Sequence, residues 1–146
     1  MQVWSTSAQL ALPIDVERVS RLDLEFIDVR RDRGSFTVLV FLNADELAQN
    51  AGRDHERFAA GYTVFAQSGC WGASGHCDWE RGPASAFDRR PEHHLRPFNL
   101  TLDVTRAVKR LGNPDALKLT IHAAALDDPA ATDVFRFRQV AALAYQ

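Results

Sequence analysis

The chain has 146 residues, of which 46% are apolar and 25% are charged, and its 17 basic and 19 acidic residues give a net charge of −2. This length suits one domain, so we predict a single domain over residues 1–146. The near balance of charge argues against a nucleic-acid partner, and no run approaches the roughly 20 apolar residues of a membrane span. The amino terminus lacks a basic region followed by an apolar one, so we expect no signal peptide and, by default, a cytoplasmic location.

Two strands are predicted in the first third of the chain. Residues 21–26 alternate polar and apolar side chains, and Ile27 and Val29 then break the phase, which predicts a β-bulge. Residues 36–42 are apolar on both faces in their second half, which is typical of a strand in the middle of a sheet. The charged segment between them, ending at Gly34, reads as a turn, so we expect the two strands to pair as a hairpin.

The next predicted elements are a possible helical turn at residues 45–49 and a strand at 62–65. Residues 98–104 alternate without error and run into a short helix from Thr105. Asp103 or Thr105 can accept hydrogen bonds from the first free N–H groups of that helix. Gly112 suits a left-handed cap, and Pro114 prevents the helix from continuing.

Two further strands complete the pattern. Residues 117–124 alternate, and His122 falls on the polar face, where we expect it to be solvated. A last strand is predicted to open at Phe135 and to reach toward Tyr145. Six or seven strands with one short helix predict an all-β fold, an antiparallel β-sandwich of jelly-roll type.

One long loop, between the strands that end near Ala66 and begin near Phe98, is rich in Gly, Cys and His. Cys70 and Cys77 lie there with His76, and His93 and His94 follow. Thiolates with imidazoles suit copper or zinc, although structural zinc sites usually space their paired cysteines by two to four residues. A Cys70–Cys77 disulfide and two reduced thiols are the alternatives, and the spacing leaves all three open.

The same loop holds other candidate residues. His93 and His94 are neighbours in an extended segment between prolines, so at most one of them should face a given site. Asp88, Arg89 and Arg90 can form ion pairs that hold the loop to the sandwich. Trp71 and Trp79 are candidate partner contacts or loop anchors, and with Trp4 they could instead stack on sugars in a carbohydrate-binding module.

No complete catalytic set is found in the sequence. It contains no G-x-S-x-G elbow, no phosphate-binding glycine loop and no H-E-x-x-H pair. A coupled dinuclear copper site needs about six histidines on a helical bundle, and this chain has five. We therefore expect the chain not to be an enzyme by itself.

Three segments together resemble the carboxy-terminal β-sandwich domain of bacterial tyrosinases and polyphenol-oxidase-like proteins. The match rests mainly on a glycine-flanked cysteine loop and a D-R-R-P-x-H-H-L run. The segments are RLDLEFIDVRRDRGSFTVLVFLN (21–43), GCWGASGHCD (69–78) and FDRRPEHHLRPFNLTLDVT (87–105).

This resemblance implies an accessory role. In the family, the sandwich is similar to a lid that packs over the entrance of a helical copper domain and takes part in its maturation. The implied function is a non-catalytic domain that binds and shields, or helps to load with copper, a separate helical type-3 copper oxidase. The alternatives from the residues themselves are a copper or zinc protein that uses Cys70, His76, Cys77 and either His93 or His94, and the carbohydrate-binding module.

Overall fold

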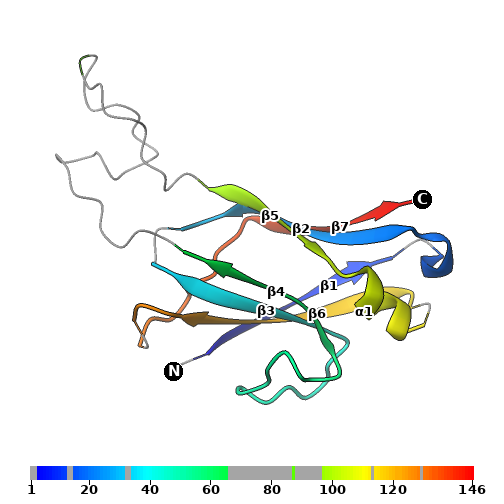
Figure 1. Ribbon diagram of the computed structural model, residues 1–146, viewed down its shortest axis with the longest axis horizontal. Helices are drawn as coiled ribbons and strands as arrows, with labels where there is room; N and C mark the ends of the chain where they lie inside the picture. Colours follow the sequence, from blue (N-terminus) through cyan, green and yellow to red (C-terminus); the bar gives the residue numbers. More distant parts are fainter. Residues whose placement is uncertain are drawn as a thin grey trace.

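Two antiparallel sheets pack face to face in the computed structural model, which describes residues 3–12, 15–31, 34–65, 87, 97–112, 114–128 and 130–146 (Figure 1). Within these residues, the four-stranded sheet has the order β1-β6-β3-β4 and the three-stranded sheet has the order β5-β2-β7. This confirms the predicted all-β sandwich. The strands are β1 (Trp4–Ala11), β2 (Arg21–Val29), β3 (Phe36–Leu42), β4 (Phe58–Val64), β5 (Phe98–Asp103), β6 (Ala116–Ala125) and β7 (Gln139–Tyr145).

The core lies between the sheets and follows from alternation along the strands. Every second residue of β3 from Phe36 to Leu42 belongs to it, as do Leu22, Leu24 and Phe26 of β2. In β6 the alternate residues from Leu117 to Ala125 face the same core. Because side chains alternate across a strand, the intervening residues lie on the outer faces of the sheets.

The predicted hairpin of β2 with β3 is wrong. β2 pairs with β5 and β7, whereas β3 pairs with β4 and β6, so the short connection 30–35 crosses from one sheet to the other. A connection of this length can span the roughly 10 Å between two packed sheets, and the apolar rows of both strands then face each other in the core. Gly34 enables the sharp crossing, since its φ is 81°.

The predicted bulge in β2 is confirmed. The pairing of β2 with β5 shifts between Phe26 and Val29, and Asp28 adopts a left-handed φ of 56°. Arg138 Nε donates to Asp28 Oδ2 at 2.6 Å, and the Arg138 N–H donates to the carbonyl of Ile27 at 2.9 Å. The bulge is thus held by the segment that leads into β7.

The predicted short helix is confirmed as α1 (Thr105–Arg110). Asp103 Oδ1 accepts from the backbone N–H of Thr105 at 2.9 Å, and Gly112 has the left-handed φ of 81° expected at the end of the helix. Thr105 Oγ1 accepts from the N–H of Leu22 at 2.8 Å, which ties the helix to β2. No helix in the described ranges is long and apolar enough to span a membrane.

Several predicted boundaries differ from the structure. Strand β1 was not predicted, and β4 begins at Phe58 rather than at Tyr62. Residues 45–49 form bends rather than a helical turn. The segment from Phe135 to Arg138 is irregular, and β7 begins only at Gln139.

Phe135 joins the two sheets although it lies outside any strand. Its ring centroid is 5.3 Å from that of Phe26 in the three-stranded sheet and 5.8 Å from that of Phe36 in the four-stranded sheet. Phe137 packs on it at 5.2 Å. Phe135 is fully buried, so its irregular segment is fixed by side-chain packing rather than by a strand ladder.

Replacing Phe135 with alanine should destabilise the protein strongly. The cavity and the lost aromatic contacts should lower the free energy of unfolding by about 3–5 kcal/mol. The matched control is Phe65→Ala, because Phe65 is 81% exposed and its truncation should change stability by about 0.5 kcal/mol or less. Urea denaturation measures both values, and equal losses would contradict the central position of Phe135.

Candidate functional site

The residues predicted to bind metal, form a disulfide or contact a partner all lie outside the described residues. The structure therefore neither places them nor brings any of them together. Among the described residues, no group of three or more His, Cys, Asp and Glu side chains is arranged to hold a metal ion. The predicted residues are Cys70, Trp71, His76, Cys77, Trp79, Asp88, Arg89, Arg90, His93 and His94.

The strands before and after the segment that holds these residues, β4 and β5, border it at the same end of the sandwich. Val64, just before Phe65, pairs with Phe36 at the start of β3. Phe98, just after Pro97, pairs with Val29 at the end of β2. Since residues 30–35 connect β2 to β3, these strand ends meet at the same end, on the left of Figure 1. We call this the loop end of the sandwich.

Basic and aromatic side chains meet at the loop end. The guanidinium of Arg31 lies 5.0 Å from the ring centroid of Phe98, within cation–π distance. Phe65 is 81% exposed. Asp127 Oδ2 accepts from the N–H of Ser35 at 2.7 Å, and the hydrogen bonds from Ser35 lower the pKa of this carboxyl. The crossing connection is therefore tied down by an ionised side chain.

A second apolar cluster covers the outer face of the four-stranded sheet. Phe41 points away from the main core but is fully buried, and its ring centroid lies 5.7 Å from His55, 6.0 Å from Phe58 and 5.3 Å from His122. In Figure 1, residues 43–57 lie on this side of β3, away from β2. The loop thus supplies a second layer over the sheet.

The prediction that His122 is solvated is wrong. It is 4% exposed, and its Nδ1 is buried without a hydrogen-bond partner. Burial lowers the pKa of His122, because the charged imidazolium loses hydration that no neighbour replaces. The ring is therefore neutral at neutral pH. Alternation put His122 on the outer face correctly, but only the packing of residues 43–57 reveals that this face is covered.

His122 lines a hollow of about 550 Å³ on this outer face, which we call the outer hollow. Its floor comes from two neighbouring strands, with Thr37 and Leu39 from β3 and residues 122–124 from β6. Residues 49–52 form one wall, and Val3 and Leu126 contribute to the margin. None of the described side chains that line the hollow belongs to Lys, Arg, Asp or Glu.

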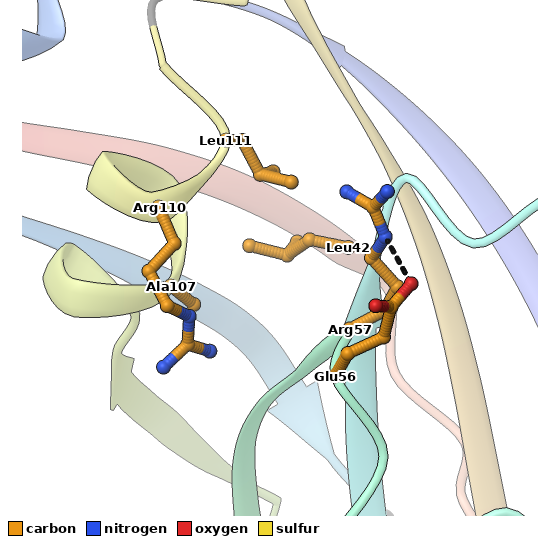
Figure 2. Close-up of a pocket in the computed structure, with 6 residues that line it drawn as sticks. All are labelled: Leu42, Glu56, Arg57, Ala107, Arg110 and Leu111. Carbon is orange, nitrogen blue, oxygen red and sulfur yellow. Dashed lines mark ion pairs between the residues drawn. The ribbon is translucent and has the colours of Figure 1, made fainter.

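A smaller hollow of about 290 Å³ separates α1 from the end of β3 (Figure 2). Leu42 and Leu111 lie between the helix and the ion pair of Arg57 with Glu56, whose Nε–Oε1 distance is 3.3 Å. Arg110 Nη2 donates to the carbonyl of Phe58 at 2.9 Å. These contacts fasten the helix to the start of β4, so we assign this hollow to the packing of α1.

Comparison with known proteins connects the fold to one group of structures. No protein-family profile and no curated protein matches the sequence. The structure is similar to latent aurone synthase, a polyphenol oxidase, from natural source and in recombinant form, each with a TM-score of 0.59 and 8% sequence identity. Each match covers 97% of this chain and 24% of the other. The chain thus has the fold of about one quarter of a polyphenol oxidase chain.

Replacing His122 with phenylalanine should make stability less dependent on pH. In the unfolded chain the imidazole has its ordinary pKa of about 6.5, and in the folded protein burial lowers this pKa. The stability that rests on a neutral His122 is therefore complete above about pH 6.5 and is lost as the pH falls toward the folded pKa.

Urea denaturation from about pH 8 to about pH 5 should show a steeper loss of stability in the wild type than in His122→Phe. The two proteins differ only at residue 122, so the difference between their profiles is assigned to that side chain. Parallel profiles would show that the imidazole of His122 is hydrated in the folded state.

Proposed function

We propose that this chain is a non-catalytic accessory domain that binds and shields a separate helical type-3 copper oxidase. The observation that carries the proposal is the fold shared with about a quarter of latent aurone synthase. That protein is a polyphenol oxidase described as latent, so its activity is held back in the form that was solved. We therefore assign to this sandwich the role of such a restraint.

The sequence resemblance supports the proposal independently of the fold. It rests on the cysteine loop at 69–78 and the run at 87–105, and it points to the carboxy-terminal sandwich of tyrosinase-like proteins. A match that spans one quarter of a polyphenol oxidase chain is consistent with such a domain. Shielding requires only a surface that fits the oxidase, so this chain need not supply catalytic residues.

The loop end of the sandwich is the surface that we propose to contact the oxidase. Phe65 is largely exposed at this end, and the guanidinium of Arg31 lies over the ring of Phe98 at the same end. Aromatic and Arg side chains are enriched among the residues that dominate the energy of protein interfaces. The same end carries both described flanks of the segment that holds the family-like motifs.

Adding the purified chain to such an oxidase should inhibit it. The oxidase should be one encoded by a neighbouring reading frame, or one from which its own carboxy-terminal domain has been removed. Oxidation of a diphenol should fall in a saturable way as the chain is added, because the domain covers the entrance to the copper site. Phe65→Ser should weaken this inhibition about tenfold, as loss of a central aromatic contact usually does.

The matched control is Tyr145→Ser, which removes another exposed aromatic side chain, 46% exposed, at the opposite end of the sandwich. Tyr145 pairs with Arg21 at the start of β2, whereas the loop end lies beyond Val29. This variant should inhibit as the wild type does. If calorimetry detects no binding to the oxidase at high micromolar concentrations, the proposal is wrong.

Copper loading is a separate part of the proposal and depends on the cysteine loop. If Cys70, His76, Cys77 and either His93 or His94 hold a metal ion, protein purified under reducing conditions should contain about one copper or zinc per chain. Cys70→Ser should then remove the metal, which elemental analysis measures. A Cys70–Cys77 disulfide in the mass spectrum, or two free thiols in metal-free protein, would exclude loading and leave the shielding function standing.

A further inference from the structure

The outer hollow has the features of a small-molecule site, and its lining residues differ from Phe65, Arg31 and Phe98 at the loop end. Its volume of about 550 Å³ falls within the usual range of ligand pockets, roughly 300–1,000 Å³. Its floor is a pair of hydrogen-bonded strands, since Leu39 of β3 pairs with His122 of β6. Such a floor is rigid, so the hollow is formed before any ligand arrives.

The walls of the hollow favour an uncharged, mainly apolar occupant. Leu39, Ala51, Ala124 and Leu126 supply aliphatic surface, and no Lys, Arg, Asp or Glu side chain is among the described lining residues. A charged ligand would lose its hydration there without gaining a counter-charge. The hydroxyl of Thr37 is already engaged with that of Thr63, at an oxygen–oxygen distance of 3.0 Å.

Among the described residues that line the hollow, His122 has a buried polar side-chain atom without a partner. It is more than nine-tenths buried, and its Nδ1 has no hydrogen bond within the described part of the chain. An unsatisfied buried polar atom is costly and usually has an explanation, such as a bound molecule. A neutral imidazole has one donor and one acceptor nitrogen. Nδ1 is closed to water, so a ligand hydroxyl in the hollow pairs with Nε2, and it can do so in either tautomer because a hydroxyl both donates and accepts.

We propose that the outer hollow binds a small neutral molecule with an apolar body and a hydroxyl group, which hydrogen-bonds to His122. The apolar body lies on Leu39 and Ala124, and residues 49–52 close one side. This inference does not depend on the proposed shielding function, because the hollow and the loop end use different residues.

Cyclohexanol is a suitable probe, because it is a neutral alcohol with a compact apolar body. In two-dimensional amide NMR spectra of the full chain, it should shift signals of residues 37–39, 49–52 and 122–126, with a dissociation constant on the order of 1 mM. Signals of β5, which belongs to the other sheet, should not move. Cyclohexylammonium and cyclohexanecarboxylate should bind about tenfold more weakly or worse.

The probe cyclohexanecarboxylate tests whether Arg53, which lies near the hollow, attracts an anionic ligand. Its Nη2 is 3.5 Å from the position that a Cβ on Gly61 would occupy, and Leu39 borders the same position. If Arg53 determined the ligand, cyclohexanecarboxylate would bind more tightly than cyclohexanol, and a neutral ligand would be excluded.

Two variants test the site itself. His122→Phe keeps a ring in place but loses the hydrogen bond, so cyclohexanol should bind about fivefold more weakly. Ala124→Leu fills the hollow and should abolish binding. Its matched control is Ala11→Leu, at an exposed position at the far end of β1, which should bind as the wild type does. Circular dichroism and the unfolding transition confirm that each variant is folded.

Three results would overturn the proposal. The first is equal shifts for all three probes, and the second is binding that survives Ala124→Leu. The third is a concentration-dependent shift of the same signals without any probe, since the occupant would then be a second copy of the chain. None of these results bears on inhibition of the oxidase, so the two proposals fail separately.

Discussion

The packing of Phe135 between the two sheets is the contact on which the rest of the structure depends. Its ring contacts Phe26 from one sheet and Phe36 from the other, so one residue of an irregular segment fixes how the sheets lie on each other. Phe137 then packs on Phe26 and Phe135, and Arg138 holds the bulge of β2. Aromatic packing and hydrogen bonding therefore replace strand pairing along this stretch.

The arrangement of the sheets determines where the candidate sites lie. Because β2 and β3 are on opposite sheets, the connection 30–35 bridges the edge of the sandwich, and Ser35 is held by Asp127. The strand partners Val64 and Phe98 are thereby brought to the same end.

Antiparallel sheets commonly have one face on the core and the other in solvent, but part of this four-stranded sheet is buried on both faces. Phe41 makes this possible, because its ring packs against His55 and Phe58 and so holds the loop 43–57 on the outer face. The loop covers His122 but leaves the outer hollow beside it. One side of the molecule thus combines a buried neutral imidazole with aliphatic walls, while the loop end combines exposed aromatic and basic side chains. These surfaces have different chemistry and suit different kinds of ligand.

The sequence alone determined all the strands except β1, the bulge after Phe26, the helix from Thr105 and its left-handed cap at Gly112. These features depend on alternation, capping and backbone conformation within a few residues, so local sequence is sufficient for them. It also singled out the cysteine loop, whose predicted ligands remain predictions. Only the tertiary structure decided that β2 and β3 belong to different sheets, that Phe135 packs at the centre without a strand, and that His122 is buried. Each of these depends on which distant residues cover a given face, and a periodic pattern carries no information about that choice.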